Sequence, residues 1–93
     1  MPSGFIVHVA GDLDLRTAGG FDAGLQQTEA LTVPGARMLL NLREVGFLGV
    51  AGLNVHDTAY QRCARKHVRL SVLAAHRTVT RPISLAGLTH CLD

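Results

Sequence analysis

The stretch RMLLNLREVGFLGVAGL, at residues 37–53, decides the fold. Its first part, residues 37–42, is a nearly continuous apolar run of strand length, as is typical of a strand buried on both faces. Phe47-Leu48-Gly49 then separates this strand from a helix that we expect between Gly52 and Lys66. Strands that alternate with helices over short links predict a sheet with parallel pairs and helical crossovers.

The segments before this stretch continue the alternation. Phe5 to Ala10 is a short β-branched run stopped by Gly11, and it predicts a strand. A helix should follow with Thr17 as its N-cap, the hydroxyl accepting from the first turn, and the region should end at Pro34-Gly35. The side chains that fall on one face of this helix are Ala18, Phe21, Leu25 and Thr28.

The segments after it are less regular. In the helix from Gly52 to Lys66, one side should be lined by Leu53, Tyr60, Cys63 and Ala64, and the solvated side by Asp57, Arg62, Arg65 and Lys66. Residues 68–74 predict a third strand, and residues 88–92 could supply a short final one. Pro82 lacks an N–H and is tolerated in the first turn of a helix, so we expect the last helix from about Thr80 to just before Gly87.

Length and composition restrict the class of protein. The 93 residues suffice for one domain, residues 1–93, with a single modest core. No apolar run is long enough for a membrane span and no signal peptide is evident, so we expect a cytoplasmic protein. The net charge of +2, the absence of Trp and the 4% aromatic content do not favour nucleic-acid binding.

The charge is unevenly divided along the chain. Residues 1–46 hold three basic and five acidic groups, whereas residues 47–93 hold six basic and two acidic groups. The basic residues of the second half are Arg62, Arg65, Lys66, Arg69, Arg77 and Arg81. We interpret them mainly as a solvated helix face and adjoining loops, with an interface for an acidic partner as the sharper alternative.

Catalytic and metal-binding patterns are missing from the sequence. Asp12 and Asp14 are more typical of a turn than of an acid–base pair. The five histidines have no metal-ligand spacing, and no serine lies in a nucleophile-elbow context. Cys63 is most simply a small core residue, and nothing around Cys91 marks it as reactive. We therefore expect no enzyme activity, no metal and no cofactor.

Three motifs in the right order resemble the STAS domains, the family of anti-sigma factor antagonists. GDLDLRTA at residues 11–18 resembles the family's G-[ED]-L-D-x-x-T-A segment. LLNLREVGFL at residues 39–48 resembles the next strand and its loop, and LAGL at residues 85–88 resembles the end of the penultimate helix. The resemblance covers nearly the whole chain and implies an α/β fold, with a central mixed sheet of about four strands and helices packed against it.

The sequence departs from the family pattern at its phosphorylation site. STAS antagonists usually carry D-S-S-G-L or D-S-T-G-L, where this chain has Gly49-Val50-Ala51-Gly52-Leu53. In the family, a partner that is both anti-sigma factor and kinase phosphorylates the second hydroxyl, and the added charge releases the domain. Ala51 occupies this position and has no hydroxyl, so the resemblance implies a lost phospho-acceptor, while Gly49 can still cap the helix.

The resemblance implies a protein-binding function without catalysis. The partner would be a serine-kinase-type anti-sigma factor or another regulatory protein, and a free sheet edge could also pair two copies of the chain. A peripheral STAS subunit of a lipid or anion transport system is the alternative. The residues expected to form the partner-binding surface are Asp12, Asp14, Arg16, Gly49, Val50, Ala51, Gly52 and Asn54.

Overall fold

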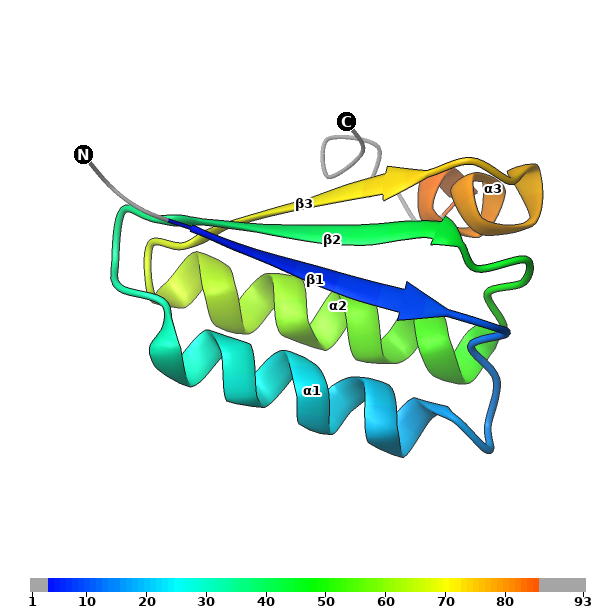
Figure 1. Ribbon diagram of the computed structural model, residues 1–93, viewed down its shortest axis with the longest axis horizontal. Coiled ribbons are helices and arrows are strands. Elements are labelled where there is room, and N and C mark those ends of the chain that lie inside the picture. The colour runs from blue at the N-terminus through cyan, green and yellow to red at the C-terminus, as the bar shows by residue number, and fades with distance from the viewer. Residues whose placement is uncertain (1–3, 86–93) are drawn as a thin grey trace.

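A computed structural model describes residues 4–85 of the chain, and strands and helices alternate along it (Figure 1). The elements are β1 (Phe5–Ala10), α1 (Ala18–Leu31), β2 (Arg37–Glu44), α2 (Val50–Arg65), β3 (Arg69–Ala74) and α3 (Arg77–Leu85). The predicted α/β class is confirmed, as are the bounds of β1. The final strand expected at residues 88–92 lies outside the described residues.

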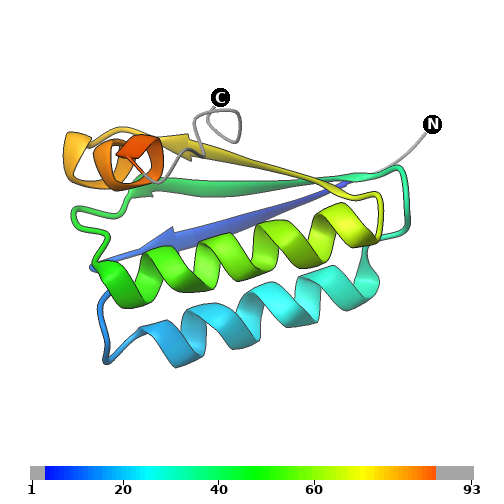
Figure 2. The ribbon, with the colours of Figure 1, turned by 180° about the vertical axis from the view of Figure 1, so that it is seen from behind.

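The sheet has the order β1-β2-β3, and both of its strand pairs are parallel. Phe5 lies opposite Met38 in the first pair, and Leu40 lies opposite Val72 in the second. Figures 1 and 2 show α1 and α2 on the same face of the sheet, as follows when successive right-handed crossovers step in one direction. Over residues 4–85 the sheet is therefore three-stranded and parallel, and neither the mixed character nor about four strands is found.

The core lies between the sheet and these two helices. β2 contributes Met38, Leu40 and Leu42, all fully buried, and α1 contributes Leu25. Cys63 of α2 is buried against Met38, as predicted for a core residue, and burial raises the pKa of its thiol to about 11. A thiol in this state stays protonated near neutral pH and is a poor nucleophile.

Two details of the predicted helix faces are wrong. On α1 the buried stripe is completed by Glu29, while Thr28 is only half-buried and its hydroxyl donates to the Gly24 carbonyl. On α2, Ala64 is exposed, whereas the expected solvated residue Arg62 is only about one-quarter exposed. Glu29 and Arg62 are sheltered for the same reason, because a partly buried ion pair joins the two helices.

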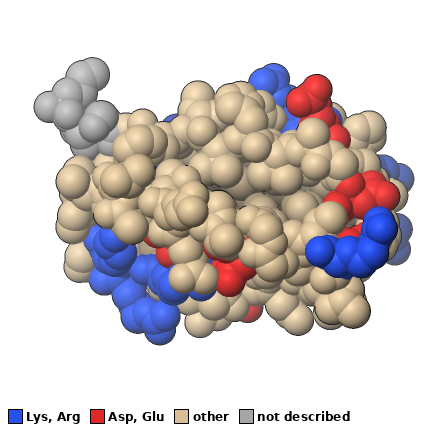
Figure 3. All heavy atoms as spheres, turned by 60° about the horizontal axis from the view of Figure 1, so that its bottom comes forward, with Lys and Arg blue, Asp and Glu red and all other residues tan. Residues whose placement is uncertain are grey.

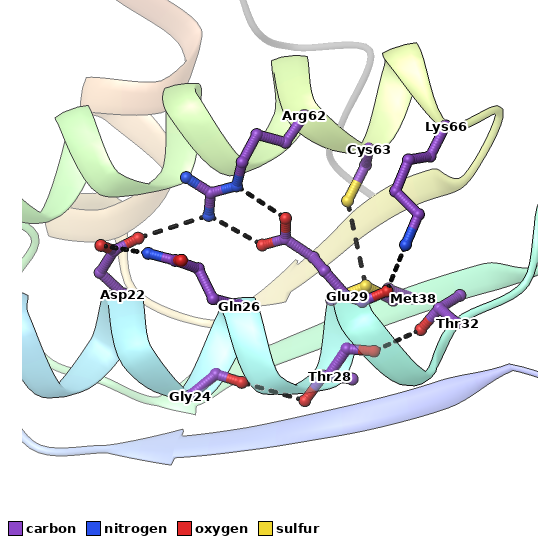
Figure 4. A network of polar contacts seen from close by, with 10 residues as sticks. All are labelled: Asp22, Gly24, Gln26, Thr28, Glu29, Thr32, Met38, Arg62, Cys63 and Lys66. Atoms are coloured by element: carbon purple, nitrogen blue, oxygen red, sulfur yellow. Dashed lines mark hydrogen bonds and ion pairs between the residues drawn. The ribbon is translucent and has the colours of Figure 1, made fainter.

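This ion pair links Arg62 of α2 to Glu29 and Asp22 of α1 (Figure 4). The Arg62 Nε and Nη2 atoms lie 2.7 and 2.8 Å from the two Glu29 carboxylate oxygens, and Nη2 lies 3.3 Å from Asp22 Oδ1. The hydrogen bonds to Glu29 raise the pKa of Arg62 above its usual range. Lys66 Nζ donates to the Glu29 carbonyl at 2.7 Å, near the end of α1. The network therefore fixes how α1 and α2 pack.

The basic residues of the second half do not form one patch. Residues 62, 65, 66 and 69 lie where α2 ends and β3 begins, whereas Arg77 and Arg81 lie on α3, beyond the other end of β3. Figure 3, which brings the helical layer forward, shows basic side chains gathered at one end of this face with acidic side chains beside them. The fold therefore separates two groups of cations that the sequence places close together.

The start of α3 is also earlier than predicted, at Arg77, so Pro82 lies inside the helix. Pro82 has no N–H to donate to the Thr78 carbonyl one turn back. That carbonyl instead accepts from the Leu48 N–H at 3.4 Å, in the loop between β2 and α2. Because of the proline, the Thr78 carbonyl is free to accept a hydrogen bond that joins α3 to the β2–α2 loop. No local sequence pattern indicates this contact.

Candidate functional site

The candidate site lies at the carboxyl ends of the parallel strands, where the loops before α1 and α2 meet (Figure 1). The Leu13 N–H donates to the Phe47 carbonyl at 2.9 Å, and the Gly49 N–H donates to the Leu13 carbonyl at 2.9 Å. Leu13 and Leu48 also form a parallel bridge beyond the strand ends. These bonds place the GDLD motif beside the segment that contains Ala51, as expected of one continuous surface.

Gly52 lies beneath this surface and is buried. A Cβ at this position would lie 2.8 Å from the Leu13 carbonyl oxygen and 2.8 Å from Leu48 Cδ1, so no side chain fits without movement. The first turn of α2 can approach the β1–α1 loop this closely because residue 52 is a glycine. Gly52 therefore positions the surface through packing, and its neighbours supply the exposed atoms.

Apolar side chains stand exposed on the two loops that meet here and on the first turn of α2. Val50 is 76% exposed, Leu15 is 85% exposed and Phe47 is 47% exposed. Ala51 is half-buried, and Asn54 is exposed one turn further along α2. Leu15 and Phe47 were not predicted as site residues. No local signal marks them, because Leu13 and Leu48 in the same two loops are also leucines and are buried.

The acidic loop before α1 has a clear structural role. Asp14 Oδ1 accepts from the Arg16 and Thr17 N–H groups at 2.9 and 3.2 Å, an Asx turn that leads into the helix. Desolvation raises the pKa of Asp14, but the hydrogen bonds from the Arg16 and Thr17 backbones together with the Arg16 charge outweigh it, and the pKa is lowered. Asp12 is exposed and Arg16 projects into solvent, 3.6 Å from the Asp14 carboxylate.

The predicted cap of α1 is correct in position and wrong in chemistry. Thr17 is the N-cap residue, yet its hydroxyl does not accept from the first turn of the helix. The hydroxyl donates to the Asp12 carbonyl at 2.8 Å and accepts from the Asp14 N–H at 3.0 Å. Thr17 therefore holds the GDLD loop against the start of α1, which orients Asp12 and Asp14.

The start of α2 confirms Gly49 as the N-cap, in an extended conformation. The first two helical residues, Val50 and Ala51, carry no hydroxyl, thiol or carboxylate. Among residues 4–85, no cluster of three or more His, Cys, Asp or Glu side chains could hold a metal ion, and no helix is long and apolar enough to cross a membrane. The chemistry available around Ala51 is contact, by apolar side chains and a few charges.

One histidine lies just behind the site. His56, one turn after Gly52 on the buried side of α2, is 0% exposed, and neither ring nitrogen has a hydrogen-bond partner within residues 4–85. Burial lowers its pKa to about 4, although the charge of Asp57 raises it slightly. The ring is therefore neutral at physiological pH and serves as part of the packing under the candidate site.

Comparison with known proteins identifies domains similar to this chain. The model of the STAS domain family matches residues 2–92. A similar solved structure is the crystal structure of an anti-sigma factor antagonist from Mycobacterium paratuberculosis, with a TM-score of 0.81 and 27% sequence identity over 95% of this chain and 73% of that one. No significant match was found among curated proteins.

Proposed function

Because the chain belongs to the STAS domain family, we propose that it is a non-catalytic protein-binding regulator of the anti-sigma factor antagonist type. The observation that carries this proposal is the exposure of three large apolar side chains on the two loops that meet at the site and on the first turn of α2, namely Leu15, Phe47 and Val50. Large apolar side chains left in water at the rigid start of a helix favour burial against a partner. The charged rim of Asp12, Asp14 and Arg16 would select the orientation of that partner.

The proposal includes a surface that phosphorylation at Ala51 cannot switch off. An alanine has no oxygen to accept a phosphoryl group, and Val50 beside it has none either. In a relative with a serine here, about two added negative charges would meet the partner inside a close interface and oppose binding. With a methyl group at this position, the domain would stay competent to bind whatever the activity of the kinase.

The proposed partner is an anti-sigma factor of the serine-kinase type or another regulatory protein, met in the cytoplasm. The β1 strand is an edge of the described sheet and carries no charged residue, so pairing between two copies is also proposed. A transport-system subunit would share the same surface. It would be distinguished by its partner, which would be a transport ATPase.

The test is a binding measurement with a matched pair of variants. Candidate kinase-type anti-sigma factors from the host are titrated onto the protein by calorimetry, with Val50→Glu as the site variant. Val33→Glu is the control, because Val33 is 58% exposed and follows α1 at the other end of the fold. We expect Val50→Glu to weaken binding by about 100-fold, as for a charge placed in an interface centre, and Val33→Glu to leave it unchanged.

The switch is tested separately with the same partner and ATP. We expect no phosphate on the native chain, and phosphate on a Gly49→Asp/Val50→Ser/Ala51→Ser variant. Phosphate on any native residue between 49 and 58 that releases the partner would contradict the proposal that phosphorylation cannot switch this surface off. Capture of a transport ATPase in place of an anti-sigma factor would favour the alternative function.

A further inference from the structure

A second surface lies beside the candidate site, between α3 and the β2–α2 loop. It is a groove of about 400 Å³, walled by Phe47 and Leu48 on the loop side and by Pro82 and Leu85 on the α3 side. Leu85 is 76% exposed, and Phe47 is shared with the surface around Ala51. The groove is therefore apolar and continuous with the proposed interface.

The walls of this groove are fixed before any partner arrives. The Thr78 hydroxyl donates to the Gly46 carbonyl, and the Thr78 carbonyl accepts from the Leu48 N–H at 3.4 Å. Val79 and Ile83, on the opposite side of α3, are fully buried in the core. A preformed groove binds without first ordering its own side chains and loops, so less binding energy is lost.

Two arginines flank the apolar walls. Arg77 and Arg81 both line the groove, are exposed, and stand four residues apart on α3, hence on one side of the helix. Among residues 4–85 neither guanidinium forms an ion pair, and α3 itself contains no acidic residue. Arg77 is also the first residue of α3, where a positive charge opposes the helix dipole. A cation kept at a locally unfavourable position is explained by a partner that supplies the opposite charge.

We propose that this groove binds an acidic segment of the protein partner, with one apolar side chain inserted between Phe47 and Leu85 and carboxylates paired with Arg77 and Arg81. The proposal rests on the proposed function, because the segment would belong to the protein that covers Val50. It adds the chemistry of that partner: an apolar anchor with Asp or Glu on its flanks. The exposed leucine and phenylalanine supply the affinity, and the two guanidinium groups select against basic segments.

The experiment selects peptides from a phage-displayed library of 12 random residues on the immobilised full chain. Enriched peptides are then titrated against an Arg77→Glu/Arg81→Glu variant. An Arg65→Glu/Arg69→Glu variant is the matched control, because both of its sites are exposed, lie at the other end of the fold and change the net charge equally. Glutamate at position 77 suits a helix start, so the site variant should keep its fold, and circular dichroism checks this.

We expect enriched peptides with an apolar residue flanked by Asp or Glu, bound about ten-fold or more weakly by the site variant and unchanged by the control, as for two exposed ion pairs turned into repulsions. Amide chemical shifts should change at residues 47–48 and 77–85. No enrichment, enrichment of basic peptides, equal loss in both variants, or binding elsewhere on the chain would overturn the proposal.

Failure of this proposal can be told apart from failure of the proposed function. If Val50→Glu abolishes binding of the anti-sigma factor while Arg77→Glu/Arg81→Glu does not weaken it, the proposal for the groove is wrong and the proposed function is supported. If acidic peptides bind the groove but no regulatory protein binds at Val50, the function fails and the groove stands. A dimer in sedimentation that the arginine variant dissociates would identify a second copy of this chain as the occupant and overturn the proposal.

Discussion

The buried histidine under the candidate site makes stability depend on pH in a predictable way. We expect lowering the pH from 7.5 to 5.0 to reduce the free energy of unfolding, because His56 resists protonation in the folded chain and accepts a proton once the chain unfolds. The ring is fully buried, both of its nitrogens lack a partner in the described part of the chain, and burial lowers its pKa to about 4. Protonation therefore favours the unfolded state.

The size and the pH range follow from the two pKa values. The ordinary histidine pKa is 6.5, and the folded value is about 4. The stabilising contribution is complete above the unfolded pKa and is lost as the pH falls from about 6.5 towards 4. The whole difference corresponds to about 3 kcal/mol, of which about 2 kcal/mol is lost by pH 5.0. The Asp14 carboxyl, whose lowered pKa acts in the same direction, titrates at a lower pH.

The assay is urea unfolding followed by circular dichroism at several pH values between 7.5 and 4.5. His56→Leu should remove most of the pH dependence and leave stability at pH 7.5 unchanged or higher, because two unsatisfied polar atoms are lost. His76→Asn is the control: this exposed histidine directly precedes α3, where asparagine suits a helix cap, and the native pH dependence should persist. A native chain equally stable at both ends of the range, or a leucine variant as pH-sensitive as the native one, would refute the reasoning.

Two further predictions concern packing. Gly52→Ala should destabilise the fold by about 1–3 kcal/mol in urea unfolding, because its Cβ would meet Leu13 and Leu48. Gly24→Ala is the control and should stabilise the fold by about 0.5–1 kcal/mol, because none of the described residues beyond its own helix backbone and chain neighbours would lie within 4 Å of the new Cβ. Two substitutions that change the free energy of unfolding in the same direction would contradict the packing role of Gly52. Glu29→Ala should cost about 2–4 kcal/mol, because the partly buried Arg62 would lose its bidentate partner and keep only the longer contact to Asp22. A double-mutant cycle with Arg62→Ala should give a coupling energy above about 1 kcal/mol, and a value near zero would show that the two residues act independently.

Much of the fold could be predicted from local patterns. The apolar runs of β1, β2 and β3 and the cap at Gly49 were readable, because burial periodicity and backbone preference act within a few residues. The resemblance to the STAS family also led us to expect that the GDLD loop and the segment around Ala51 lie together, and the hydrogen bonds between Leu13, Phe47 and Gly49 place the two segments side by side. Residue 51 is an alanine in the sequence, and a methyl side chain has no oxygen to accept a phosphoryl group.

Other features required partners far apart in the chain. The local pattern predicts that Arg62 lies on a solvated helix face. In the structure it is paired with Glu29, which lies 33 residues earlier in the chain. From the sequence, Pro82 is expected in the first turn of a helix. In the structure it lies inside α3, and the Thr78 carbonyl that Pro82 cannot bond accepts from the Leu48 N–H instead. Exposure at Leu15, Phe47 and Leu85 is likewise invisible locally, because an apolar side chain in a sequence predicts burial.

The sequence by itself determined the order of strands and helices, the family and the absence of a hydroxyl at residues 50 and 51, since each depends on residues close together in the chain. Only the tertiary structure decided that Arg62 is paired across two helices, that Gly52 is a packing residue, and that a groove flanked by Arg77 and Arg81, which form no ion pair within residues 4–85, lies between α3 and the β2–α2 loop. These depend on which surfaces the crossovers bring into contact, and contact between distant segments leaves no local pattern.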